Sequence, residues 1–159
     1  MELRLLAFAA ASGRSAIVFF VGEQLMDWRI SECAAKSADQ AKVWIERQIE
    51  ALKPDVIVTE NPTQASRKGE ISRSIIEAVS WVAERLQLLN PRVTRQHQYA
   101  NKYEEADAIA ELYPDLKPWQ PTRRRFFENE PRNIILFEAM SYALTILGEP
   151  PRQPDVAMG

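Results

Sequence analysis

The chain has 159 residues, enough for one domain with a buried core, and its 46% hydrophobic and 26% charged residues are typical of globular proteins. The formal net charge of −2 excludes a global basic field that would attract nucleic acid, although a local basic face remains compatible with it. The single cysteine, Cys33, excludes an internal disulfide and fits a reducing, cytoplasmic location.

The first residues loosely resemble a short secretory signal, because Arg4 precedes the apolar residues 5–11. That run is at the lower limit for a signal sequence, and its removal would deprive the next strand of its hairpin partner. We therefore expect the segment to stay in the protein as a strand. No stretch approaches the ~20 apolar residues of a membrane span, so we expect no membrane partner.

Three strands, a helix and a fourth strand are predicted in the first part of the chain. The three N-terminal segments are β-prone and separated by turn residues, which favours consecutive antiparallel strands. Ser37 can cap the helix, whose apolar residues recur at three- and four-residue spacing. Residues 56–58 form a β-branched run typical of a central strand covered on both faces. The predicted ranges are strands 3–11, 16–21, 25–31 and 56–60 and a helix over 37–52.

The second part of the chain is predicted to be mainly helical. Its elements are a helix over 71–89, an edge strand over 92–97, a helix over 103–112 and an irregular, proline-rich connection over 116–130 with a short helix. A last helix follows, capped by Asn129 or Glu130, with Pro131 at its first position and its end at Leu147. The last helix is apolar almost all round, so we expect it to be buried. The order β-β-β-α-β-α-β-α-α indicates one α/β domain over residues 1–147, with helices on both faces of a five-stranded mixed sheet. We expect residues 148–159 to be a flexible tail.

Two carboxylates stand out by their positions. Glu60 ends the central strand, where a metal-dependent nuclease with this order of elements would keep one ligand. Glu138 is the only charge between Arg132 and Glu149, inside an apolar helix where an unpaired acid is costly. It is either solvent-facing or paired with an arginine, or it forms a site with Glu60. Two such carboxylates could hold Mg²⁺, whereas two-metal phosphodiester cleavage needs about three or four acids. The other acids considered, which we interpret as surface charge, are Asp27, Glu104 and Asp107.

Basic residues could contact phosphates at two places, each close to a loop. Arg67 and Lys68 follow the Glu60 strand, and Arg123, Arg124 and Arg125 precede two phenylalanines that could stack on bases. The three arginines are also compatible with a solvated turn. The only histidine, His97, we interpret as structural or exposed. The sequence contains no P-loop, GxGxxG or CxxC motif, so we expect no nucleotide cofactor and no structural zinc.

The order of elements over residues 3–147 resembles the ribonuclease H-like superfamily, and within it the RuvC-type Holliday junction resolvases. Lys53-Pro-Asp-Val-Ile-Val-Thr-Glu60 is similar to the strand of that family that ends in a catalytic glutamate. Ala100-Asn101-Lys102 is similar to its Ala-x-Lys segment, and residues 138–144 resemble the helix with the last metal ligands. The resemblance implies Mg²⁺ at Glu60 and Glu138, phosphate contacts from Lys102 and the basic residues above, and a homodimer that acts on DNA.

The sequence departs from the family pattern at two acids. The first-strand aspartate falls near Ala9, and the last-helix aspartate falls on Met140 or Ser141. Our leading hypothesis is therefore a RuvC-like pseudoenzyme with a degraded or incomplete nuclease centre, which binds branched or duplex DNA without cutting or cuts it weakly.

Two alternatives remain. In the first, the chain is an active Mg²⁺-dependent endonuclease, and folding or a second subunit supplies the missing acid. In the second, the chain is a protein-interaction or structural subunit that uses the fold alone. The negative net charge slightly favours this second alternative.

Overall fold

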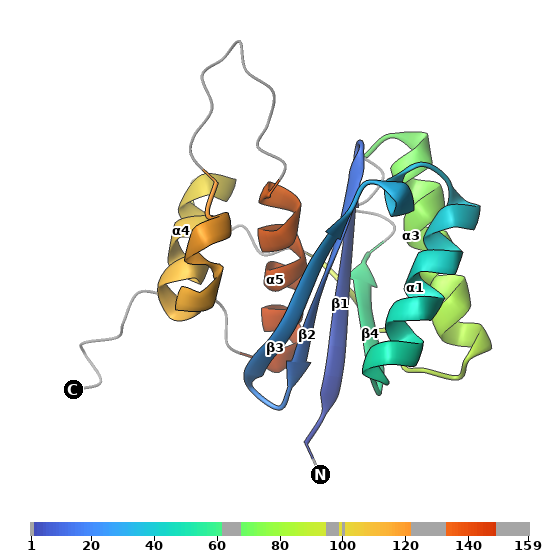
Figure 1. Ribbon diagram of the computed structural model, residues 1–159, viewed down its shortest axis with the longest axis horizontal. Helices are drawn as coiled ribbons and strands as arrows, with labels where there is room; N and C mark the ends of the chain where they lie inside the picture. The colour runs from blue at the N-terminus through green and yellow to red at the C-terminus, as the bar shows by residue number, and fades with distance from the viewer. Residues whose placement is uncertain (1, 62–67, 95–98, 100, 122–132, 149–159) are drawn as a thin grey trace.

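A five-stranded sheet lies between two layers of helices in the computed structural model of the chain (Figure 1). The structure describes residues 2–61, 68–94, 99, 101–121 and 133–148. The strands are β1 (Arg4–Ala11), β2 (Arg14–Val21), β3 (Gln24–Ser31), β4 (Val56–Glu60) and β5 (Arg92–Val93). The helices are η1 (Cys33–Ala35), α1 (Ala38–Leu52), α3 (Glu70–Arg85), α4 (Lys102–Leu112), η2 (Pro114–Trp119) and α5 (Ile134–Leu147).

The sheet is mixed, with the strand order β3-β2-β1-β4-β5. β1 pairs antiparallel with β2, and β2 pairs antiparallel with β3. β4 lies parallel to β1 on one side and to β5 on the other. The predicted five-stranded mixed sheet and order of elements are therefore confirmed, and β4 occupies the covered position expected from its β-branched run, with all five residues buried.

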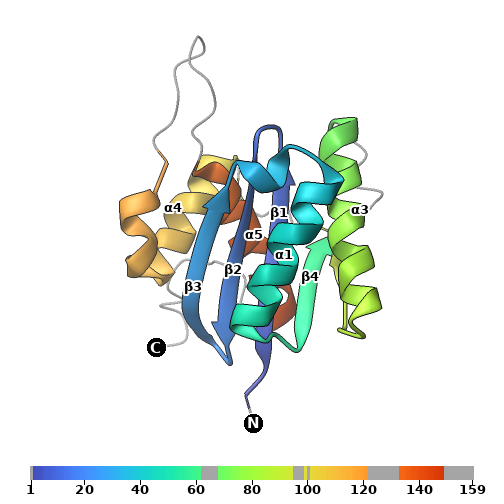
Figure 2. The same ribbon diagram turned by 45° about the vertical axis from the view of Figure 1, so that its right-hand side comes forward.

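Two apolar cores form because alternate residues of each strand face opposite helix layers. α1 and α3 cover one face of the sheet, while α5 covers the other and packs against α4 (Figures 1 and 2). On β1, Leu5, Ala7 and Ala9 belong to the core beneath α5. The intervening residues of β1, including Phe8 and Ala10, belong to the core beneath α1 and α3.

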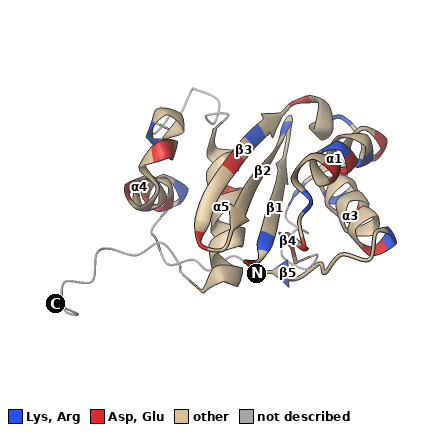
Figure 3. Cartoon of the chain, turned by 60° about the horizontal axis from the view of Figure 1, so that its bottom comes forward, with Lys and Arg blue, Asp and Glu red and all other residues tan. Residues whose placement is uncertain are grey.

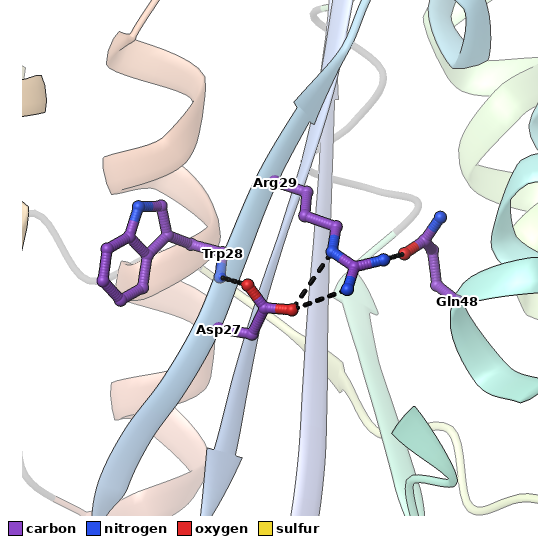
Figure 4. Close-up of polar contacts among 4 residues, drawn as sticks. All are labelled: Asp27, Trp28, Arg29 and Gln48. Atoms are coloured by element: carbon purple, nitrogen blue, oxygen red, sulfur yellow. Dashed lines mark hydrogen bonds and ion pairs between the residues drawn. The ribbon is translucent and has the colours of Figure 1, made fainter. Parts of the chain in front are cut away.

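The edge strand β3 shows the same alternation in its side chains (Figure 4). Trp28 packs on the α5 side, where its ring meets Trp119 edge-on at a centroid distance of 5.4 Å. Arg29 reaches the other way, pairing with Asp27 at 2.8 Å and donating a hydrogen bond to Gln48 of α1. Within the described residues this strand has a neighbour on one side only, and charged side chains discourage further strand pairing at such an edge.

α5 is buried, as its composition predicts. Ten of its residues are buried, from Ile134 to Leu144, and all of these except Ser141 belong to one apolar core. Charges of both signs instead lie on α1, α3 and α4 (Figure 3). No helix in the described ranges combines the length and apolar character that crossing a membrane requires.

Two predicted ranges differ from the structure. The helix predicted to reach Leu89 ends at Arg85, because Gln87 adopts a left-handed backbone with φ of 60°. The backbone of Leu89 instead forms a parallel β-bridge with Val56, so Leu89 extends the sheet rather than the helix. β5 contains only Arg92 and Val93, and residues 95–97 of the predicted strand, which include His97, lie outside the described residues.

The buried ring of Phe20 provides a test of the core beneath α5. Phe20 is 0% exposed and meets Tyr113 edge-on at 5.8 Å between ring centroids. We expect Phe20→Ala to lower the free energy of unfolding by about 3–5 kcal/mol, because the substitution leaves a cavity. Urea titration followed by circular dichroism measures this change. Val43→Ala, at a 51% exposed position of α1, is the control and should change stability by less than about 0.5 kcal/mol.

Candidate functional site

Glu60 is placed at the site by the alternation of β4. Val56 and Val58 face the core beneath α5, so Glu60 points to the same side of the sheet. The residue is 5% exposed. Ala7 of β1 pairs with Val58, and continuing this register sets Ala9 level with Glu60. A methyl group therefore stands where the resemblance expects the first aspartate.

Glu138 and Lys68 complete a cluster with Glu60. The Lys68 Nζ atom lies 2.6 Å from Oε1 of Glu138 and 3.1 Å from Oε1 of Glu60. The same ammonium group donates a hydrogen bond to the backbone carbonyl of Ala10 at the end of β1. Lys68 lies just before α3, so one cation contacts β1, β4 and α5 at once. Of the predicted site residues, the structure thus brings Glu60, Glu138 and Lys68 together.

The three charged side chains are largely removed from water. Their exposed fractions are 6% for Glu60, 13% for Glu138 and 18% for Lys68. The Lys68–Glu138 contact is a charge-assisted hydrogen bond, whereas the Lys68–Glu60 contact is an ion pair. Among the described residues, Oε1 of Glu60 accepts no hydrogen bond. Its negative charge is therefore compensated mainly by the nearby ammonium group.

Tyr142 gives Glu138 a further partner. The Tyr142 hydroxyl donates a hydrogen bond of 2.5 Å to Oε1 of Glu138, the same oxygen that Lys68 contacts. The two residues are four positions apart on α5, so they lie on one face of the helix. The ring of Tyr142 is 0% exposed. This contact fixes the orientation of the carboxylate toward Lys68.

A third buried carboxylate, Glu105, approaches α5 from α4. It is 5% exposed and accepts a hydrogen bond of 3.2 Å from the Ser141 hydroxyl. Ser141 lies three residues after Glu138, on the same side of the helix. Burial raises the pKa of the Tyr99 phenol above its usual value of 10.0, and the negative charge of Glu105 raises it further.

The donor set does not fit Mg²⁺ as the side chains are arranged. In the described part of the chain, no three His, Cys, Asp or Glu side chains are grouped closely enough to hold a metal ion. The ammonium of Lys68 lies against both candidate carboxylates, and a Mg²⁺ ion would need the same oxygens at about 2.1 Å. The metal role predicted for Glu60 and Glu138 remains a prediction.

The remaining predicted nucleic-acid contacts are only partly described. Lys102 is the first residue of α4, which Asn101 caps by accepting hydrogen bonds from the backbone N–H groups of Tyr103 and Glu104. Arg67 and Arg123, Arg124 and Arg125 lie outside the described residues. The acids interpreted as surface charge are indeed on the surface: Glu104 and Asp107 are exposed, and Asp27 is partly exposed beside Arg29.

Comparison with known proteins finds similar structures but no related sequence. No protein-family model and no curated protein matches the sequence. The structure is similar to that of T. thermophilus RuvC in complex with Holliday junction substrate, with a TM-score of 0.57 and 12% identity over 91% of this chain and 92% of that one.

The chain has a RuvC-like fold. A second structure of Thermus thermophilus RuvC agrees, with a TM-score of 0.53 and 11% identity over 90% of this chain and 96% of the other. The predicted ribonuclease H-like α/β fold is therefore confirmed across nearly the whole chain. At this level of identity the likeness establishes the arrangement of elements and leaves the chemistry to the residues.

Three features of the site were missed in the sequence. The role of Tyr142 could have been predicted, because a tyrosine four residues after a lone helical acid can donate a hydrogen bond to that acid. Glu105 lies in an acidic stretch, Glu104-Glu105-Ala106-Asp107, where sequence gave no reason to separate the buried acid from its exposed neighbours. Lys68 was noticed as a basic residue, but its pairing with Glu138 spans 70 positions and depends on tertiary packing.

The pKa of Tyr99 offers a test of the Glu105 environment. We expect Glu105→Gln to lower the pKa of Tyr99, because removing the carboxylate makes the phenolate easier to form, while burial keeps the pKa above 10.0. Titration of tyrosine ring carbons by NMR, with the Tyr99 signal assigned from Tyr99→Phe, measures this shift.

Glu104→Gln is the matched control, since Glu104 is exposed and adjacent in sequence. A change of the Tyr99 pKa by the same amount in Glu104→Gln would show that Glu105 has no special influence on the phenol.

Proposed function

We propose that this chain is a RuvC-like nucleic-acid-associated protein that binds branched or duplex DNA with a nuclease centre unable to cleave it. The observation that supports this proposal best is the ammonium of Lys68 between Glu60 and Glu138 on a RuvC-like fold. A RuvC structure with the same arrangement of elements was solved with a Holliday junction substrate. The fold therefore favours a DNA partner, while the centre disfavours hydrolysis.

The missing acids argue against metal-assisted cleavage by this centre. Two-metal cleavage requires anionic ligands that hold both metal ions and stabilise the attacking and leaving oxygens. Ala9 lies level with Glu60 and provides only a methyl group, and Ser141, one turn after Glu138, is already bonded to Glu105. The two remaining carboxylates share a cation supplied by the protein.

Phosphate contacts are assigned in this proposal to Arg67, Lys102 and the arginines at positions 123–125. Each is a cation that can neutralise phosphate charge without reading sequence. Lys68 is a poorer candidate than the sequence predicts, because two carboxylates engage its ammonium group. A homodimer in the cytoplasm would present two such basic surfaces to the arms of a branched DNA.

One observation favours the alternative of an active Mg²⁺-dependent endonuclease. Glu105 is a buried acid that reaches the helical turn following Glu138 through Ser141. If the side chains rearranged around DNA, Glu105 could serve as the third acid. This alternative requires Lys68 to leave the two carboxylates, and cleavage would then depend on Glu60.

The two proposals are separated by binding and cleavage of a labelled four-way DNA junction. We expect fluorescence anisotropy to detect binding in EDTA as well as in Mg²⁺, and gel electrophoresis to show no cleavage in Mg²⁺ or Mn²⁺. Replacing Arg123, Arg124 and Arg125 together by alanine should weaken binding and reduce the slope of log affinity against log salt by about 2–3.

The matched control replaces three exposed cations in or just before α1 and α3, Lys36, Arg47 and Arg73, by alanine. This control has the same total charge as the arginine variant and should bind the junction more tightly than that variant does. Metal-dependent cleavage that disappears in Glu60→Gln would establish the endonuclease alternative. Absence of binding to any DNA would leave the structural-subunit hypothesis.

A further inference from the structure

We infer that the ammonium group of Lys68 is the built-in cation of this centre and replaces the divalent metal that a two-carboxylate site on this fold would otherwise take. The wild-type centre is therefore closed to metal, and removal of Lys68 opens a metal site at Glu60 and Glu138. This inference deepens the proposed function, but it concerns the cation preference of the centre and can be tested without DNA.

The ammonium group of Lys68 makes two hydrogen bonds and one further ion pair. Such a group has three N–H donors and no acceptor. Its three neighbours are the carbonyl of Ala10, the carboxylate of Glu138 and the carboxylate of Glu60, which come from β1, α5 and β4. A charged side chain that surrounds itself with acceptors from three elements acts as a structural cation rather than as a surface charge.

The position of Nζ excludes a metal at the same carboxylate oxygens. Nζ lies 2.6 and 3.1 Å from the two Oε1 atoms, and Mg²⁺ would need to approach them to about 2.1 Å. An ion at that distance from both atoms would overlap the ammonium group. The Tyr142 hydroxyl also takes up part of the acceptor capacity of the Glu138 oxygen. Metal binding at these two oxygens and the Lys68 contacts are therefore mutually exclusive.

Burial makes the two carboxylates dependent on a cation. Glu60 and Glu138 are 6% and 13% exposed, so water screens their charges poorly. Removing one member of a buried ion pair is strongly destabilising, because the remaining charge is left uncompensated. Lys68→Ala creates this situation for two carboxylates at once. A divalent cation that enters the vacated space should restore the compensation and stabilise the variant.

The experiment measures thermal unfolding and Mn²⁺ binding for four forms of the full chain: wild type, Lys68→Ala, Lys68→Ala/Glu60→Gln and Lys36→Ala. In EDTA we expect Lys68→Ala to lower the unfolding midpoint by about 10 °C. Mn²⁺ at 100 times its dissociation constant should raise that midpoint again by about 5–10 °C. Electron paramagnetic resonance should show one bound Mn²⁺ in Lys68→Ala and none at this centre in wild type.

The other two forms locate the effect. Lys68→Ala/Glu60→Gln should be more stable in EDTA than Lys68→Ala, because one uncompensated charge is gone, and its midpoint should not respond to Mn²⁺. Lys36→Ala removes an exposed lysine outside the centre and should behave like wild type. If Lys68→Ala is unfolded in EDTA, refolding in Mn²⁺ or through the added Glu60→Gln change supports the inference.

Three results would overturn it. The first is stoichiometric Mn²⁺ binding to the wild type that Glu60→Gln abolishes. The second is a Lys68→Ala variant that is as stable as wild type. The third is a destabilised Lys68→Ala variant that neither Mn²⁺ nor Glu60→Gln stabilises. Because none of these measurements uses DNA, a failure of DNA binding would count against the proposed function and leave this inference standing.

Discussion

The arrangement of side chains at the centre of this protein depends on the ion pairs of Lys68 with Glu60 and Glu138. The two carboxylates end a central strand and line a buried helix, positions where an isolated charge is unstable. Lys68 compensates the negative charge of both carboxylates and also donates a hydrogen bond to the backbone carbonyl of Ala10 near the end of β1. The pairs therefore join the sheet to α5 and anchor the chain just before α3.

This chain keeps the RuvC-like fold but lacks some of the acids that the resemblance expects at its centre. The arrangement of strands and helices is shared with RuvC over about nine tenths of the chain. That arrangement depends on alternating apolar residues and on a buried α5, which many sequences can provide. The reaction of a nuclease depends on a few acids. Where the resemblance expects two of them, this chain has an alanine, Ala9, and either Met140 or Ser141.

Sequence patterns were reliable where each residue acts through its near neighbours. The hydroxyl of Ser37 accepts a hydrogen bond from the backbone N–H of Gln40, as the cap predicted. The β-branched run before Glu60 is buried throughout, and the apolar residues of α5 form a core. The predicted end of α3 was wrong. Leu89 fits the helical spacing of apolar residues, but in the structure its backbone pairs with Val56 of β4.

The sequence by itself therefore determined the order of elements, the mixed sheet and the two carboxylates worth following, because strand alternation and helical spacing are local properties. Only the tertiary structure decided what those carboxylates contact. Glu138 meets Lys68 across 70 positions and Glu105 meets Ser141 across 36, and no local pattern encodes such distances. The physical reason is that charge compensation in a buried site depends on separation in space, which the packing of α5 and α4 against the sheet fixes.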